Sequence, residues 1–203
     1  MKRYLIFIIM FAVLFTSCKK DTENVSFVTT FAEFDMKGDQ YQSFVVGQKY
    51  VEQGVSAKEG EKSLEIITKG SVDESKAGVY EITYSAINSD GFPGSIKRYV
   101  AVLPSAPTVD ISGSFFYKAN PTFTTTMTKL APGFYTFGNI WGASVIPAYV
   151  LSSNGVDLTL PLSQLSGYGR VQGTGKIDGS EMTLRVTLLD QGLSNVARIW
   201  VKN

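Results

Sequence analysis

The sequence contains no histidine, and its only cysteine is Cys18. Zinc, copper and haem sites of the usual kinds depend on histidine or on several cysteines, so the composition excludes them. Catalysis by a Ser-His-Asp or Cys-His arrangement is excluded as well, because an imidazole has to accept the proton of the nucleophile. Only carboxylate, lysine or tyrosine chemistry stays open. We therefore expect no metal, no other cofactor and no enzymatic activity.

An excess of charge of either sign is also missing. The chain has 19 basic and 18 acidic residues, and without residues 1–17 it has 17 basic and 18 acidic residues. This balance leaves no basic surface for phosphate groups and excludes a nucleic-acid partner. Long stretches with helical periodicity are missing too, whereas aromatic residues, β-branched residues and 19 glycines are present. The composition therefore predicts an all-β protein.

The N-terminus carries the longest apolar run. Lys2 and Arg3 precede twelve uninterrupted apolar residues, Tyr4 to Phe15. As a helix this run would reach about 18 Å, whereas a membrane span needs about 20 residues, so residues 1–17 are predicted to be a signal peptide. Its end, Thr16-Ser17-Cys18, resembles the signal of bacterial lipoproteins, in which the cysteine is lipidated and becomes the mature N-terminus. The alternative is an ordinary secretory signal in which Cys18 is incidental.

The lipoprotein resemblance implies an outer-membrane anchor, with palmitate or similar acyl chains attached through Cys18. Acyl chains contribute about 0.8 kcal/mol per buried CH₂, and lipoproteins carry more than one chain, so such an anchor is stable. Residues 18–24 are predicted to be the lipidated tether, because Lys19 to Asn24 are polar and have no apolar period. Lysines followed by acids loosely resemble the export signal of surface-exposed Bacteroidetes lipoproteins. The alternative is a solvated linker without that role.

Residues 25–103 alternate short apolar runs with turn residues. The clearest strand is Gly78 to Ala86, in which Tyr80, Ile82 and Tyr84 share one face and polar residues occupy the other. This period of two is typical of a half-buried antiparallel strand. Asn88 to Gly91 predicts the turn that follows it. Further strands are predicted at Ser26–Phe31, Ser43–Val46, Tyr50–Val55, Leu64–Ile67 and Ile96–Leu103.

This half resembles the bacterial immunoglobulin-like domains of cell-surface proteins. Gly78 and Tyr80 look like the tyrosine corner of a β-sandwich, in which a buried tyrosine bonds to the backbone through its hydroxyl. The resemblance implies an Ig-like β-sandwich with a spacer or adhesion role. It is carried by Tyr50 to Ala57, Gly70 to Asp73, Gly78 to Tyr80, Tyr84 to Ala86 and Arg98 to Val102.

Pro104 and Pro107 mark a stiff linker at residues 104–110. Beyond it, residues 111–203 predict a C-terminal antiparallel β domain, either a barrel or a sandwich. Asp178-Gly179 predicts a hairpin turn within it. Its eight predicted strands are Gly113–Tyr117, Thr122–Leu130, Phe134–Phe137, Val145–Leu151, Val156–Leu160, Gly169–Lys176, Glu181–Leu189 and Val196–Val201.

Taken together, the chain resembles a family of two-domain lipoproteins of gut Bacteroidetes whose genes lie beside outer-membrane glycan-uptake systems. Asp110 to Gly113 and Pro132 to Phe137 carry the C-terminal part of this resemblance. It implies a cell-envelope protein that binds glycan or assists its uptake. Its partners would then be a polysaccharide and outer-membrane uptake proteins.

A candidate glycan site lies in the C-terminal half. Small residues surround Trp141 in the stretch Phe137 to Gly142, and a ring exposed on a loop suits the apolar face of a sugar. We predict that Trp141, Asn139, Tyr149 and Tyr168 form this site. The alternative is that Trp141 packs in the core, as large aromatic residues mostly do. Convergence of the three rings on one exposed surface would favour binding, and burial of all three would favour docking onto another protein.

Isolated carboxylates give a weaker signal. Asp157 with Asp178 or Asp190 is the best available pair for acid–base catalysis, and each of these residues lies in or beside a predicted turn. Aspartates in turns usually bond to the backbone, and a glycosidase needs two carboxyls at a set separation. The pair therefore does not change the expectation of a protein without catalytic activity.

Overall fold

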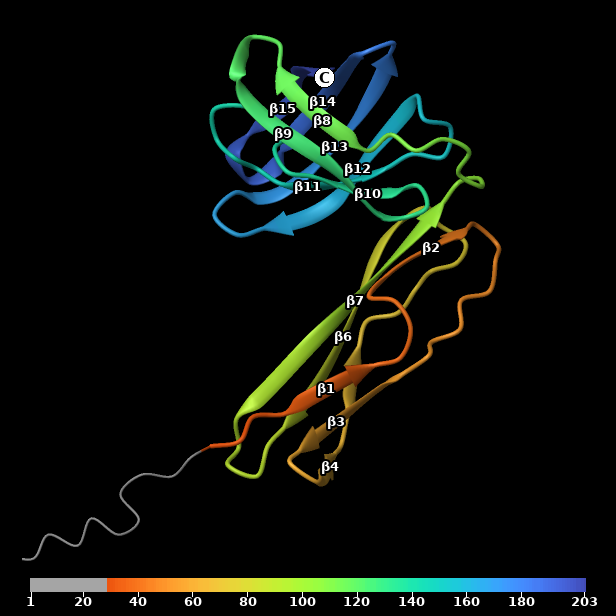
Figure 1. Ribbon diagram of the computed structural model, residues 1–203, viewed down its shortest axis with the longest axis vertical. Helices are drawn as coiled ribbons and strands as arrows, with labels where there is room; N and C mark the ends of the chain where they lie inside the picture. The colour runs from red at the N-terminus through yellow and green to blue at the C-terminus, as the bar shows by residue number, and fades with distance from the viewer. Residues whose placement is uncertain (1–28) are drawn as a thin grey trace, which may run out of the picture. The chain divides into compact units, whose positions relative to one another are not determined.

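The computed structural model describes residues 29–203, and Figure 1 shows that the regular structure of these residues consists of β-strands joined by turns and loops. The predicted all-β fold is confirmed. The predicted signal peptide at 1–17, the lipidated Cys18 and the tether lie outside the described residues. The strands of the N-terminal half are β1 (Glu33–Met36), β2 (Tyr41–Val45), β3 (Val55–Glu59), β4 (Lys62–Leu64), β5 (Ile67–Lys69), β6 (Gly78–Ile87) and β7 (Pro93–Leu103).

The N-terminal half consists of two sheets with strand orders β1-β3-β4 and β2-β7-β6-β5. The long β6–β7 hairpin is its largest paired unit, and β2 pairs with β7 in parallel. The predicted alternation in β6 is confirmed, because Ile82, Tyr84 and Ala86 are buried. One face of this hairpin therefore supplies the core of the half.

Three strand predictions in this half differ from the structure. Of the predicted strand Ser26–Phe31 only residues 29–31 are described, and these are not a strand; the first strand of the described residues begins at Glu33. The stretch Tyr50–Val55 is irregular up to its last residue, because the Glu74 carboxylate accepts from the Tyr50 N–H and the Glu52 carboxylate accepts from the Gly54 N–H. Side chains thus replace a neighbouring strand as backbone partners. The predicted strand Leu64–Ile67 is divided between β4 and β5.

The predicted tyrosine corner is correct in its hydrogen bond and wrong in its burial. The Tyr80 hydroxyl donates to the Lys76 carbonyl at 2.8 Å. The Tyr80 side chain is only half-buried. It ties the start of β6 to the preceding turn, as the sequence predicted, but contributes less core than expected.

A buried charge lies in the core of this half and was not predicted. Arg98 of β7 is fully buried, donates to the Glu52 carboxylate and to the Lys37 carbonyl, and lies over the Tyr84 ring at 5.9 Å from its centre. The Tyr50 hydroxyl donates to the same Glu52 carboxylate. This network links β7 to the irregular segments that hold Lys37 and Glu52.

The C-terminal half is a closed barrel of eight antiparallel strands in the order β10-β11-β12-β13-β14-β15-β8-β9. This result decides between the predicted barrel and sandwich. Its elements are β8 (Gly113–Tyr117), β9 (Asn120–Ala131), β10 (Phe134–Phe137), β11 (Ala148–Leu151), β12 (Asp157–Leu165), β13 (Gly169–Asp178), β14 (Glu181–Leu188), the 3-10 helix η2 (Leu189–Gln191) and β15 (Leu193–Lys202).

Alternating apolar side chains fill the barrel. Phe115, Phe137 and Trp200 form a central aromatic cluster, with ring centres 5.5 Å apart for Phe115–Phe137 and 5.3 Å apart for Phe137–Trp200. The predicted Asp178-Gly179 turn is confirmed. Asp178 pairs with Glu181 across a two-residue loop, and Gly179 has a φ of 58°, which glycine adopts without strain.

Residues 107–110 are fastened to the barrel. The Thr108 N–H donates to the Ser153 carbonyl at 2.9 Å, and the Tyr135 hydroxyl donates to the Val109 carbonyl at 3.2 Å. Asp110 forms an ion pair with Lys129 at 3.0 Å. The segment that leads into β8 therefore runs along the outside of the barrel with its polar groups bonded to it.

Candidate functional site

The loop between β10 and β11, residues 138–147, contains two of the predicted site residues. Asn139 is buried and organises this loop, because its side-chain oxygen accepts from the N–H groups of Trp141 at 2.9 Å, Gly142 at 3.0 Å and Ile146 at 3.4 Å. Its side-chain nitrogen donates to the Gly142 carbonyl at 2.7 Å. The amide is committed to the loop, so the predicted role of Asn139 as a surface hydrogen-bonding group has no support in this geometry.

Trp141 is half-buried and does not present a free ring. The guanidinium of Arg198, from β15, lies 3.8 Å from the centre of the indole. Arg198 lies opposite Leu184, a residue of the barrel core, in the register of β14 and β15, and Trp141 packs against the same core. A cation–π contact of this kind stabilises the loop against the barrel. One face of the indole is therefore occupied, contrary to the exposed platform that the sequence predicted.

The two tyrosines pack against different core clusters. Tyr149 packs against Tyr99 and Phe134, with ring centres 5.4 and 5.1 Å away, and burial raises the pKa of its hydroxyl. Tyr168 precedes β13 and packs against the barrel core together with Trp141. Trp141, Tyr149 and Tyr168 are all half-buried. The rings thus show neither the exposure that would favour binding nor the burial that would favour docking, and their assignment to a glycan site stays a prediction.

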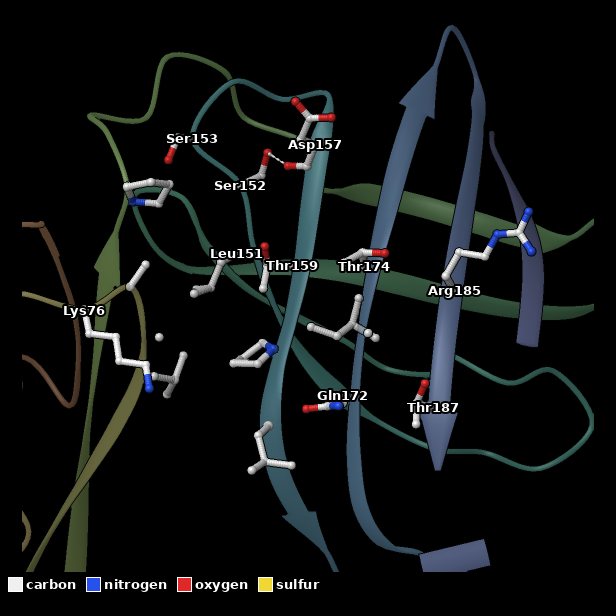
Figure 2. A pocket seen from close by; sticks show the side chains of 18 of the residues that line it. Lys76, Leu151, Ser152, Ser153, Asp157, Thr159, Gln172, Thr174, Arg185 and Thr187 are labelled. Atoms are coloured by element: carbon white, nitrogen blue, oxygen red, sulfur yellow. Dashed lines mark hydrogen bonds between the residues drawn. The ribbon is translucent and has the colours of Figure 1, made fainter. Parts of the chain in front are cut away.

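A groove of about 930 Å³ lies beside strands β12, β13 and β14. Figure 2 shows its lining, with β12, β13 and β14 forming one wall and Lys76 on the opposite side. The strand register sets Thr159 beside Thr174, and Gln172 beside Thr187. Because the barrel core takes every second side chain, these four point outward, and they form a polar wall.

Most polar groups of this wall are free to bind. Among residues 29–203, the side chains of Thr159, Gln172 and Thr174 have no hydrogen-bond partner, and Lys76 has no ion-pair partner. The Thr187 hydroxyl accepts from the Asn195 N–H at 3.0 Å and keeps its own proton for a further bond. Tyr80, Pro161 and Leu162 add apolar surface to the groove. The groove thus combines uncommitted hydroxyl and amide groups with an apolar area that is the larger part of its lining.

Sequence reasoning missed this wall, although a signal for it exists. Thr159, Gln172, Thr174 and Thr187 are the polar members of alternating strands that were predicted correctly as strands. Alternation tells which side chains face outward, but many outward polar residues are only solvated. A groove became visible only once the register had placed the four residues side by side.

The candidate carboxylates do not form a catalytic pair in the groove. Asp157 lines the groove, and its carboxylate accepts from the Asn154 amide at 2.8 Å. Asp178 ends β13 beside its turn, and Asp190 forms an ion pair with Arg170 at 2.6 Å. Within the described part of the chain, no group of three or more carboxylates or other ligating side chains is placed to hold a metal ion.

None of the helices formed by residues 29–203 has the length and apolar character needed to cross a bilayer.

Comparison with known proteins identifies the N-terminal half. Residues 34–102 match the family described as bacterial surface protein, Ig-like domain, so the chain contains an Ig-like domain as the sequence predicted. None of the curated proteins matches the chain. Among solved structures, a lipoprotein from Bacteroides thetaiotaomicron is similar, with 21% identity over 85% of this chain and 100% of that chain and a TM-score of 0.43.

Proposed function

We propose that this chain is a lipid-anchored protein of the bacterial outer membrane whose barrel binds glycan and whose Ig-like domain acts as a spacer. The match of residues 34–102 to surface Ig-like domains supports a location in the cell envelope. The sequence Thr16-Ser17-Cys18 after an apolar run supports the anchor. Glycan binding is supported by the groove of the barrel rather than by the aromatic residues predicted at first.

The single observation that carries the proposal is the polar wall of Thr159, Gln172, Thr174 and Thr187. Three of these side chains have no partner among the described residues, and all four border a groove of about 930 Å³. A sugar offers hydroxyls at close intervals that both donate and accept, and threonine and glutamine side chains match both roles. The volume lies within the range of about 300–1,000 Å³ that is usual for ligand sites.

The expected affinity is modest. An open groove leaves part of a ligand in water, and neutral hydrogen bonds are weaker than charge-assisted ones. We expect dissociation constants between about 1 μM and 1 mM, equivalent to roughly −8 to −4 kcal/mol. Because the chain without residues 1–17 has 17 basic and 18 acidic residues, added salt should change the affinity little.

The test is affinity electrophoresis of the soluble chain from Asp21 onward through gels that contain individual polysaccharides. The variant Thr174→Val removes one hydroxyl of the wall at nearly constant volume, and Gln172→Ala removes the neighbouring amide. Each should weaken binding by about two- to tenfold, because one neutral hydrogen bond contributes about 0.5–1.5 kcal/mol. Thr124→Val is the matched control, since Thr124 is exposed on β9 and does not line the groove.

Equal retardation of Thr174→Val, Gln172→Ala and the control would refute the groove as the site. Absence of retardation by every polysaccharide would refute glycan binding itself. The predicted site residue Trp141 enters the same test, because Trp141→Ala should leave glycan binding unchanged if the groove is the site.

The anchor is tested separately by growing cells with radioactive palmitate. The parent chain should carry the label and Cys18→Ala should not. Label of equal strength in both would contradict lipidation at Cys18.

The alternative function is docking onto another envelope protein without a ligand of its own. It is favoured by Leu162, which is 60% exposed beside a second groove of about 600 Å³ lined also by Tyr99 and Tyr149. Exposed apolar side chains beside a groove are common at protein contacts. If docking is the function, Leu162→Asp should abolish co-purification with an outer-membrane uptake protein, whereas Thr174→Val should have no effect.

A further inference from the structure

The exposed end of the β6–β7 hairpin carries apolar side chains that the fold leaves in water. Phe31 is 65% exposed, Ile87 is 53% exposed and Phe92 is 51% exposed. The rings of Phe31 and Phe92 contact each other with centres 6.3 Å apart, and Ile87 pairs with the exposed Pro93 across the hairpin. We refer to Phe31, Ile87, Phe92 and Pro93 as the tip patch. Contiguous exposed apolar surface of this kind marks contact with a membrane or a partner.

The tip patch is held in place rather than loosely displayed. The Phe92 N–H donates to the Asn88 side chain at 2.7 Å, and the Asn88 N–H donates to the Phe92 carbonyl at 3.1 Å. The neighbouring Ser89 donates through its N–H to the Glu59 carboxylate at 2.9 Å, which ties the turn to β3. The turn from Asn88 to Phe92 is thus closed by hydrogen bonds between its two ends and is also bonded to the β3–β4 hairpin. These bonds hold Phe92 in one arrangement. The exposed half of the Phe92 ring gains nothing from folding, so its position suits contact with another phase or molecule.

Phe31 is the member of the tip patch that lies nearest in sequence to the proposed anchor at Cys18. Phe31 follows Cys18 by 13 positions in the sequence. Even fully extended, 13 residues span at most about 45 Å, so a lipid on Cys18 keeps Phe31 within that distance of the bilayer. A tether this short gives the tip patch a high effective concentration at the membrane, so that even a weak affinity for lipid leads to contact.

Charge near the tip patch does not drive such contact. Lys58, Glu59 and Lys62 belong to the β3–β4 hairpin that holds Ser89, and Glu61 and Asp90 lie in the two turns themselves. These two basic and three acidic side chains leave one excess negative charge, which gives no attraction to anionic lipid, so apolar insertion has to supply the interaction. Aromatic and aliphatic side chains on a loop enter the boundary between headgroups and acyl chains by about 5–10 Å.

We propose that the tip patch inserts into the lipid surface to which the chain is anchored and so orients the Ig-like domain on the membrane. This inference rests on the proposed lipid anchor at Cys18. It gives the Ig-like domain a second point of attachment, at the opposite end of β7 from the barrel that begins after Leu103.

The test uses the lipidated full chain purified from membranes and reconstituted into vesicles of phosphatidylethanolamine and phosphatidylglycerol whose acyl chains are brominated near the headgroup. Phe92→Trp places a fluorophore in the tip patch, and bromine quenches an indole only at close range. Val145→Trp is the matched control, because Val145 is 67% exposed in the β10–β11 loop. The emission of the parent, from Trp141 and Trp200, is subtracted from both.

The added emission of Phe92→Trp should be mostly lost in brominated vesicles and shifted to shorter wavelength in unbrominated ones, whereas that of Val145→Trp should be unchanged. Adding Phe31→Ser to Phe92→Trp should reduce the quenching, because one inserted ring is removed. Unquenched Phe92→Trp emission, or equal quenching at both positions, would overturn the proposal.

Flotation of the vesicles separates this failure from failure of the anchor. A chain that does not float with vesicles contradicts lipidation and therefore the insertion as well. A chain that floats while its Phe92→Trp emission stays unquenched overturns membrane insertion alone, and the tip patch would then be assigned to a protein partner.

Discussion

The buried ion pair in the Ig-like domain gives the sharpest stability prediction. Arg98 is 0% exposed and Glu52 is 31% exposed, and the guanidinium donates to that carboxylate and to the Lys37 carbonyl. Glu52→Gln keeps the size and an accepting oxygen at position 52 but leaves the buried charge of Arg98 without its counter-ion. Removing one partner of a fully buried pair costs about 3–5 kcal/mol. Because water reaches Glu52 in part, we expect a loss of about 2–3 kcal/mol.

The assay is urea unfolding followed by far-ultraviolet circular dichroism, with amide hydrogen exchange of β6 and β7 to localise the effect. Glu81→Gln is the matched control, because Glu81 and Lys97 form an ion pair at 2.8 Å whose side chains are 43% and 45% exposed. An exposed pair of this kind contributes about 0.2–1 kcal/mol. Equal unfolding free energies for the two variants would refute the reasoning.

A double variant distinguishes lost charge balance from lost packing. Replacing a buried pair by apolar side chains of similar size is often neutral. Arg98→Met combined with Glu52→Gln should therefore recover much of the stability lost in Glu52→Gln alone. A double variant less stable than Glu52→Gln would assign the effect to packing of the arginine.

The same pair makes stability depend on pH. Burial opposes ionisation of Glu52, but hydrogen bonds from Tyr50 and the Gly54 N–H, together with the charge of Arg98, outweigh it and hold the pKa of its carboxyl below 4.5. A group with a lowered pKa in the folded state contributes stability above its unfolded pKa, and loses it as pH falls through the folded pKa. The difference between the parent and Glu52→Gln should therefore be full at neutral pH and shrink in acid below about pH 4.5.

Three further predictions concern single contacts. Tyr80→Phe removes the hydroxyl bond to the Lys76 carbonyl and should lower the free energy of urea unfolding by about 1 kcal/mol, whereas an unchanged midpoint would remove any role for the corner. Asn139→Ala removes the four hydrogen bonds that organise the β10–β11 loop. The fluorescence emission of the half-buried Trp141 should therefore shift to longer wavelength, whereas that of the fully buried Trp200 should stay unchanged. An unshifted emission spectrum would contradict this role of Asn139. Gly173→Ala would place a Cβ 2.3 Å from the Arg185 carbonyl oxygen. The variant should destabilise the barrel by about 1–3 kcal/mol in calorimetry. A melting temperature equal to that of the parent would show that β13 and β14 can move apart without loss of stability.

The amino-acid sequence alone determined most strands of the barrel. Strands β8 and β10 have the predicted bounds, and the other six overlap their predictions. A strand with one face in a core has a period of two, and a turn such as Asp178-Gly179 has a local backbone requirement, so both are written in neighbouring residues. The choice between a barrel and a sandwich was left open, because closure depends on pairing between β9 and β10 and between β15 and β8 as well as between sequential neighbours.

Local pattern failed where side chains far along the chain supply the backbone partners. Tyr50 to Val55 has the composition of a strand, yet the Tyr50 N–H bonds to Glu74, which lies 24 residues away. The ion pair of Glu52 with Arg98 joins residues 46 positions apart. No window of neighbouring residues contains such partners, so their effect on the backbone cannot be derived from periodicity.

The candidate site shows the same division. Composition identified Trp141, Tyr149 and Tyr168 as aromatic residues near glycines and turns, but burial depends on what faces each ring, and Arg198 and Tyr99 became their neighbours only in the folded chain. The polar wall of the groove depends in turn on the register that sets Thr159 beside Thr174 and Gln172 beside Thr187. The sequence by itself therefore determined which residues could form strands and which of their side chains face outward. Only the tertiary structure decided which of those side chains share a surface, because a shift of one residue in register would turn each to the opposite face.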